Sequence, residues 1–240
     1  MPKRKTEFIN GEIYHITARS VDGRPLFMDG EDNWRGIFAL YEFNREESVT
    51  IRRQREKRAK LKQEIRIKAR SIPDAVAARL DQCDDRDKQV EILVFVFMPN
   101  HVHLLVRQLK PDGVRVFVSR FCKGYAQYFN ARYERMGALF QGRFEAKYVG
   151  DNDYLKTLFV YIHTNPVSII SPGWKEKGVE DAAKAKRFLG KYRWSSYLDY
   201  LGQNNFPSIT NRTFFNKIFK EPETMKEFVD SRIGYKAIYR

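Results

Sequence analysis

The sequence of 240 residues is short of several features that mark particular protein classes. It has two cysteines, Cys83 and Cys122, which form no metal-type cluster, and neither needs a disulfide partner. The longest apolar run, Ile92 to Met98, is far too short to span a bilayer. The basic opening MPKRKTEFIN lacks the apolar stretch of a signal peptide. We therefore expect a cytosolic (cytoplasmic) protein.

Acidic side chains are also in short supply. The chain has 30 Asp and Glu against 44 Lys and Arg, which gives a formal net charge of +14. This excess predicts a polyanionic partner, either nucleic acid or an anionic membrane face. Apolar residues make up 42% of the chain, enough for a hydrophobic core, so disorder is excluded as a description of the whole. The length corresponds to one or two domains.

The positive charge is concentrated in residues 51–70, which carry ten basic and two acidic side chains. Such a stretch is typical of a solvated helix or mobile arm, and the alternative is an arm that contacts nucleic acid. Residues 71–90 are acidic and return the chain to balance. We interpret 44–90 as a charged helical insertion in one main domain, residues 1–200. Residues 201–240 form a C-terminal extension without a motif.

The periodicity of apolar residues predicts alternating strands and helices. The clearest signal is 91–106, where two apolar runs flank Pro99-Asn100, and we expect a β-hairpin at the centre of a sheet. Asp32 and Asp151 are candidate helix N-caps, and Pro166 closes the second of these helices. The pattern predicts an α+β fold with helices over one antiparallel sheet. The expected strands are 12–18, the hairpin and a short strand ending at Val149; the expected helices are 30–44, 113–134 and 152–165.

Two of the four histidines, His101 and His103, lie two residues apart on an expected strand. Strand side chains alternate, so both imidazoles leave one face and Val102 and Leu104 leave the other. Two neutral imidazoles pointing one way make half of a divalent-metal site. Taken alone, the pair also fits packed or surface histidines.

Tyr161 and Asn165 are four residues apart on an expected helix and share a face. Asn165 offers an amide oxygen to a hard metal ion, and Tyr161 offers a phenol that can attack phosphorus. The alternative is that Tyr154, Leu158 and Tyr161 form a core stripe and that Asn165 is a C-cap. His163 lies on another face of this helix, and we do not assign it as a ligand. His15 is expected to pack or to make a polar contact.

His101 and His103 stand in the block FMPNHVHLLV (97–106), and Tyr161 and Asn165 stand in the block YIHTNPV (161–167). These two blocks resemble the histidine motif and the tyrosine-helix motif of the single-tyrosine HUH transposases, in particular the REP-associated tyrosine transposases related to the insertion sequence 200 group. The remaining similar blocks are YHITARS (14–20) with PLF (25–27), GALFQGRF (137–144) and RWSSY (193–197). The blocks keep the family's order over residues 8 to about 200. The segment 44–90 looks longer than the family's usual connection.

The resemblance implies a ferredoxin-like sheet with helices on one face and the HUH strand near its centre. It implies that His101, His103 and Asn165 are metal ligands and that Tyr161 is the nucleophile. The implied ion is Mg²⁺ or Mn²⁺, although the histidines alone would also suit Zn²⁺. The implied activity is metal-dependent cleavage and transfer of single-stranded DNA through a 5′-phosphotyrosine, and the implied substrate carries hairpins from repetitive palindromes.

Basic residues between 107 and 150 are the candidates for DNA contact, because phosphate contacts from Lys and Arg provide affinity. Arg143 is the best individual candidate, because it lies in the GALFQGRF block. The other candidates are Arg115, Arg120, Lys123 and Lys147. We expect a monomer or homodimer with no membrane partner and no small-molecule cofactor.

Three other functions remain open at this point. The first is a non-catalytic, domesticated protein that binds hairpin DNA; such a protein would be expected to lack a ligand or the tyrosine. The second is a metallo-phosphoesterase that uses water, but such enzymes usually place Asp or Glu ligands near their histidines, and 92–106 has none. The third is an RNA-binding domain, which would leave the His, Tyr and Asn residues without a role.

Overall fold

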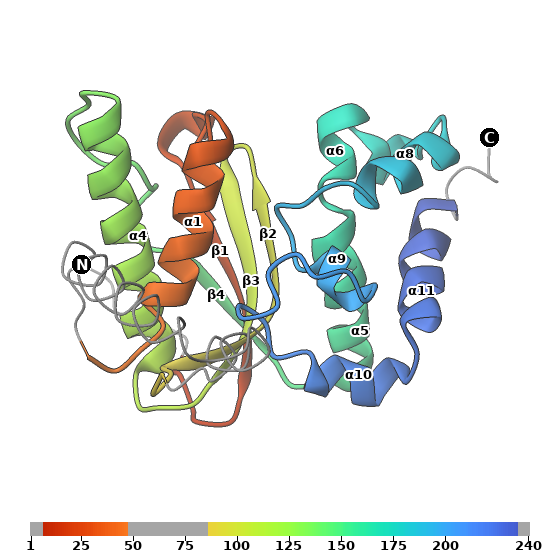
Figure 1. Ribbon diagram of the computed structural model, residues 1–240, viewed down its shortest axis with the longest axis horizontal. Coiled ribbons are helices and arrows are strands. Elements are labelled where there is room, and N and C mark those ends of the chain that lie inside the picture. Colours follow the sequence, from red (N-terminus) through yellow and green to blue (C-terminus); the bar gives the residue numbers. More distant parts are fainter. Residues whose placement is uncertain (1–6, 48–85, 235–240) are drawn as a thin grey trace, which may run out of the picture.

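The computed structural model describes residues 7–47 and 86–234 (Figure 1). Four strands form the sheet: β1 (Ile13–Arg19), β2 (Val90–Met98), β3 (His101–Gln108) and β4 (Glu145–Val149). The principal helices are α1 (Gly30–Glu42), α4 (Gly113–Arg132), α5 (Asn152–Thr164), α8 (Ala182–Leu189), α10 (Thr213–Phe219) and α11 (Pro222–Gly234). Short helical turns are η1 (Val21–Gly23), α6 (Val167–Ile170), α7 (Trp174–Lys177) and α9 (Tyr197–Tyr200).

The sheet has the strand order β2-β3-β1-β4, and every neighbouring pair is antiparallel. With α1 and α4 as the crossovers, this is the ferredoxin-like arrangement, so the α+β prediction is confirmed. The strand β3, which carries His101 and His103, lies in the interior of the sheet. In the register of β1 with β3, Thr17 lies opposite His103 and Arg19 lies opposite His101.

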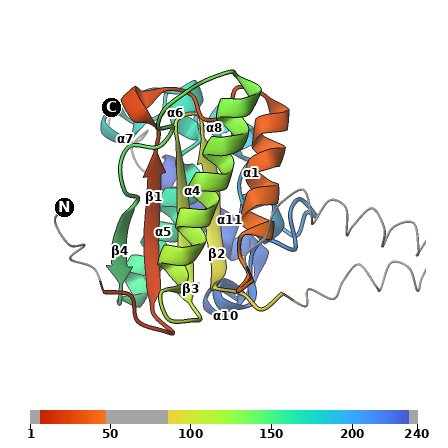
Figure 2. The same cartoon turned by 90° about the vertical axis from the view of Figure 1, so that its left-hand side faces the viewer.

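One face of the sheet is covered by α1 and α4, which lie side by side in front of the strands in Figure 2. The apolar stripe of α4 packs against alternate residues of β3, and Phe117, Phe121 and Tyr125 are fully buried there. The positions of α1 and α4 agree with the prediction that helices pack over one antiparallel sheet.

The opposite face is covered in part by α5, a layer that the sequence analysis did not predict. Its apolar residues pack on β2 and on Leu105 of β3, and the C-terminal helices α8, α10 and α11 pack behind it (Figure 1). Phe215, Phe219 and Val229, which fall in the predicted extension 201–240, are buried in this same core.

The hairpin prediction is confirmed, but only one of its strands is interior. β2 is an edge strand, and its apolar character has another cause: its open side is covered by residues 194–196. The Phe97 amide donates to the Trp194 carbonyl at 2.9 Å, and the Ser196 amide donates to the Phe95 carbonyl at 3.0 Å. A strand whose edge is closed in this way is buried like a central strand.

The first helix begins at Gly30, as expected, but another residue caps it. Its N-cap is Asp29, whose carboxylate accepts from the amides of Glu31 and Asp32, so the assignment of Asp32 as N-cap is wrong. Asp32 is instead fully buried and accepts hydrogen bonds from the hydroxyl of Tyr133 and the guanidinium of Arg132 on the α4 side. The Asp151 cap is confirmed, because its carboxylate accepts from the Tyr154 amide at 2.8 Å.

Most of the charged insertion 44–90, including the basic run 51–70 and Cys83, lies outside the described residues. Within the part of the chain that the structure describes, no helix is long and apolar enough to cross a membrane.

Candidate active site

The histidine pair is presented by the tight β2–β3 turn at Pro99 and Asn100. His101 and His103 leave the face of β3 that is directed toward α5, while Val102 and Leu104 are buried against α1 and α4. His103 is 2% exposed, whereas His101 is partly exposed. The predicted sharing of one face is therefore confirmed, and the pair lies at the boundary between core and surface.

Both imidazoles are oriented through their Nδ1 atoms. The Nδ1 atom of His103 lies 3.0 Å from Nε2 of His15 and 3.2 Å from Oγ1 of Thr17. His101 donates from Nδ1 to the amide oxygen of Asn100 at 2.7 Å. If the Nδ1 proton of His103 is likewise donated, to His15 or Thr17, Nε2 of each ring keeps its lone pair for a ligand bond.

Burial keeps these imidazoles neutral. Burial, together with the positive charges of Arg19 and Lys175, lowers the pKa of His101 to about 4. Burial also lowers the pKa of His103 to about 2, with smaller contributions from His101 and His15. The pKa of His15 is lowered to about 4 by burial and by Lys147. Neutral imidazole is the form that binds metal ions.

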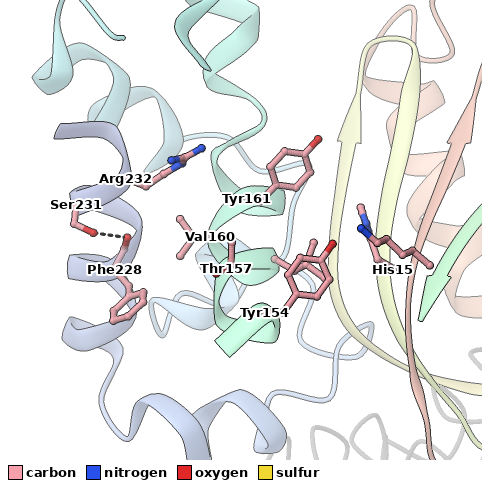
Figure 3. Close-up of a pocket in the computed structure, with 10 residues that line it drawn as sticks. His15, Tyr154, Thr157, Val160, Tyr161, Phe228, Ser231 and Arg232 are labelled. Atoms are coloured by element: carbon pink, nitrogen blue, oxygen red, sulfur yellow. Dashed lines mark hydrogen bonds between the residues drawn. The ribbon is translucent and has the colours of Figure 1, made fainter. Parts of the chain in front are cut away.

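The helix α5 brings Tyr161 to the histidines. Its ring centroid lies 5.7 Å from that of His103 and 6.2 Å from that of His15, in edge-on geometry. The ring is partly exposed, and it extends from α5 toward the strand that carries His15 (Figure 3). Asn165 is the C-cap residue of α5, and its amide group donates to the Tyr161 carbonyl at 2.9 Å.

Lys175, on the short helix α7, joins this site although no sequence motif marked it. Its ammonium donates to the Asn165 amide oxygen at 2.7 Å and lies 4.4 Å from the Tyr161 ring centroid. The preceding residue, Trp174, is buried and donates to the Ser168 hydroxyl, so the backbone of α7 is held in place. The oxygen that was expected to bind a metal thus already accepts from a cation.

The donor set fits a divalent ion in its chemistry. Among the described residues, no three His, Cys, Asp or Glu side chains gather closely enough to hold a metal. A centre built on His101 and His103 therefore needs a ligand of another type, and the Asn165 amide oxygen is of a type that Mg²⁺ and Mn²⁺ accept. The Lys175 ammonium would have to leave that oxygen first.

The predicted DNA-contacting residues are divided between two sides of the molecule. Arg115, Arg120 and Lys123 lie on α4, across the sheet from the histidine pair. Arg115 pairs with Asp112 at 2.5 Å, and Arg120 donates to the carbonyls of Arg45 and Glu46. The contacts of Arg120 connect α4 to the residues that follow α1, and DNA contact by Arg115, Arg120 and Lys123 stays a prediction.

Lys147 and Arg143 lie on the other side, at or near β4. Lys147 is exposed on β4, opposite His15 in the register, and its ammonium lies 5.2 Å from the Tyr154 ring centroid. Arg143 is exposed just before β4, near the end of β1 that carries Arg19. Arg19 was part of a quoted block but was not assigned a role; its charge acts on all three site histidines.

His163 is placed away from this site. It is fully buried, its Nε2 lies 2.8 Å from the Ser196 hydroxyl, and burial lowers its pKa to about 3. His15, for which packing or a polar contact was expected, makes the polar contact to His103.

Residues 49–165 match the model of the family described as IS200-like transposase. Comparison with curated protein sequences finds no match. Among solved structures, a REP-associated tyrosine transposase bound to a REP hairpin is 13% identical, with a TM-score of 0.45, over 89% of this chain and 96% of that chain. The matched range includes the histidine pair, Tyr161 and Asn165, and over this range the chain is similar to the IS200-like transposases.

Proposed function

We propose that this protein is a metal-dependent endonuclease and strand transferase of single-stranded DNA, with Tyr161 as the nucleophile. The observation that carries the proposal is the convergence of Tyr161 on His103 and His15, with the Lys175 ammonium beside the same ring. A partly exposed phenol between neutral imidazoles and a fixed cation suits attack on an anionic ester.

In the proposed reaction the phenol oxygen of Tyr161 attacks the phosphorus of a phosphodiester. A bond forms between this oxygen and phosphorus, and the bond from phosphorus to the 3′ oxygen breaks. The proton lost from the phenol is balanced by the proton gained at the leaving oxygen, which becomes a free 3′-OH. The products are a 5′-phosphotyrosine and that hydroxyl. Because the ester bond is retained, a second 3′-OH can reverse the step and join strands.

His101, His103 and Asn165 would hold the divalent ion. When bound, the ion polarises a non-bridging phosphate oxygen and neutralises developing charge. The contacts to Asn100, Thr17 and His15 orient the two imidazoles for this task, as outer partners of ligating histidines generally do.

Three cations of the chain would guide the phosphate to Tyr161. Lys175 lies against the Tyr161 ring, while Arg19 and Lys147 act on His15 strongly enough to lower its pKa. Fixed positive charge close to the attacked phosphate offsets its repulsion of a nucleophile. Arg143 remains our candidate for a contact farther along the DNA.

The substrate proposed is single-stranded DNA that contains a hairpin from a repetitive palindrome. A paired stem can be held through its phosphates, and unpaired flanks can reach the buried edge of the site. The alternative function is a domesticated protein that binds hairpin DNA without cutting it. All four expected site residues are present, which favours the enzyme.

A covalent-adduct assay tests the proposal. Labelled single-stranded oligonucleotides from the DNA that flanks this gene are incubated with the protein and Mn²⁺, Mg²⁺ or EDTA, then run on a denaturing gel. We expect a metal-dependent protein–DNA adduct that is lost in Tyr161→Phe and in His101→Ala. An adduct that survives Tyr161→Phe would identify another nucleophile. Tight hairpin binding without any adduct would favour the non-catalytic alternative.

A further inference from the structure

A groove opens directly beside Tyr161 on the α5 side of the sheet. Its cavity volume is about 610 Å³, within the range of about 300–1,000 Å³ typical of pockets that hold small organic ligands. His15 and Tyr161 line its inner end, and α11 supplies its outer wall through Phe228, Ser231 and Arg232 (Figure 3). The groove shares Tyr161, His15 and Lys147 with the chemistry proposed above, whereas Tyr154 and the residues of α11 have no part in that chemistry.

Aromatic rings line the groove at two places. Tyr154 projects from α5 on the same side as Tyr161, one ring following the other along the helix (Figure 3). Phe228 projects from α11 and is 44% exposed, although its neighbour on the helix, Val229, is fully buried. The Phe228 ring contacts the buried Phe219 ring, with their centroids 5.5 Å apart, and its exposed part offers a face on which a nucleobase can stack.

The charge of the groove complements a nucleic-acid backbone. Lys147 and Arg232 are among its lining residues, and no acidic side chain belongs to the described set that lines it. Lys147 lies beside the Tyr154 ring, with its ammonium 5.2 Å from the ring centroid. A cation next to an aromatic platform is the combination used by proteins that bind single strands with little sequence preference.

We propose that this groove binds the unpaired nucleotides that adjoin the phosphodiester at Tyr161. Their bases would stack on Tyr154 and Phe228, and their phosphates would lie near Lys147 and Arg232. The proposal rests on the proposed function, because a strand cleaved at Tyr161 must continue past that residue, and the groove begins there. Apolar lining with cations at its margins favours a single strand over a paired stem, whose bases are not free to stack.

Affinity measurements with three DNA probes test this site without requiring cleavage. The probes are a labelled hairpin with its natural unpaired flanks, the same DNA with abasic flanks, and the hairpin without flanks. We expect Tyr154→Ala and Phe228→Ala to weaken binding of the first probe about tenfold and to leave the other two unchanged. Abasic flanks keep their phosphates, so they separate stacking from charge. Arg232→Ala should weaken both flanked probes and spare the hairpin without flanks.

Matched controls keep the test specific. Met136→Ala removes an apolar side chain that is 94% exposed and outside the groove, and Lys226→Ala removes a charge from α11 outside the groove. Equal losses for all three probes, or no loss for the flanked hairpin, would overturn the proposed subsite. The adduct assay reports separately on Tyr161, so failure of cleavage and failure of this groove are distinguishable. Circular dichroism confirms that each variant is folded.

Discussion

The two faces of the sheet are built from the same strands but contain different side chains. On the face covered by α1 and α4, the rings of Phe95, Phe97 and Phe121 are completely buried. On the face toward α5, β1 and β3 present His15, Thr17 and His103 instead. Because strand residues alternate, β1 and β3 supply the α1 and α4 core with one set of side chains and the site with the other, whereas β2 has apolar side chains on both faces.

This difference separates stability from chemistry. Apolar burial against α1 and α4 supplies folding free energy. Polar groups buried on the α5 side must instead find partners, and His103 does so with His15 and Thr17. We therefore expect the core under α1 and α4 to hold the site on the α5 side in position. Substitutions in that core should mainly change stability, and substitutions in the site should mainly change activity.

The largest expected effect is at the nucleophile. Tyr161→Phe removes one hydroxyl from a partly exposed ring, so adduct formation should fall by about 10⁴-fold or more while the free energy of unfolding stays nearly unchanged. Adduct yield and urea denaturation measure the two quantities. Tyr148→Phe, at an exposed tyrosine of β4 that does not line the groove, is the matched control and should keep its activity. A large loss of stability in Tyr161→Phe would contradict the idea that site residues on the α5 side contribute to activity and not to stability.

The converse effect is expected on the α4 face. Phe121 is fully buried beside Phe97 and Tyr125, so Phe121→Ala should lower the free energy of unfolding by about 3–5 kcal/mol. Adduct formation per folded molecule should be unchanged, because no contact of Phe121 reaches the histidines. Met136→Ala serves as the exposed control. Lost activity in a variant with unchanged stability would show that this face takes part in the site.

A smaller effect is expected at Lys175, where one substitution should lower the maximal adduct rate and at the same time strengthen the response to the metal ion. Its ammonium holds the Asn165 oxygen and lies beside Tyr161, so Lys175→Met should reduce the maximal adduct rate about tenfold. The same change frees the Asn165 oxygen, so the Mn²⁺ concentration that gives half the maximal rate should fall. A titration of the adduct rate with Mn²⁺ measures both. Lys177→Met, on the same short helix, should change neither, and a raised metal requirement in Lys175→Met would contradict the proposed competition.

Much of this arrangement was accessible from periodicity and motifs. Alternation along 101–104 predicted which side chains share a face, and the apolar stripe of 113–134 predicted α4, because both follow from local geometry. The quoted blocks named His101, His103, Tyr161 and Asn165. The structure places Tyr161 beside His103 and joins Asn165 to Tyr161 through Lys175, while the roles of these residues stay predictions.

Long-range contacts explain what the sequence could not predict. Lys175 reaches Asn165 only because buried Trp174 positions α7, and no spacing rule encodes that contact. The apolar residues of β2 indicated a central strand, yet they are buried by residues 194–196, which are about a hundred positions away. Asp32 lies just before a run of apolar residues at helical spacing and therefore resembled an N-cap. In the structure its carboxylate instead accepts hydrogen bonds from Arg132 and Tyr133, at the end of α4.

The smallest expected effect concerns the segment that joins the two faces over the edge of β2. Tyr200 packs in the α5 core and Phe206 packs in the α1 and α4 core, and the buried Asp199 carboxylate links them by accepting from the Phe206 amide at 2.9 Å. Burial raises the pKa of Asp199 above its ordinary value of 3.8, against the opposing effect of its hydrogen bonds. This pKa is higher in the folded than in the unfolded state, so the ionised form costs folding free energy.

The contribution of Asp199 to stability is therefore greatest below pH 3.8, declines as pH rises through the raised pKa, and is constant above it. Asp199→Asn removes this titration but keeps an oxygen that can accept from the Phe206 amide. Urea denaturation of both proteins at several pH values between 4 and 7 should show wild type losing stability relative to the variant as pH rises. If the difference in the free energy of unfolding between wild type and Asp199→Asn does not change with pH, then burial does not destabilise the ionised Asp199 carboxylate. In that case Asp199 would behave like a solvent-exposed carboxylate, although it lies between the two buried cores.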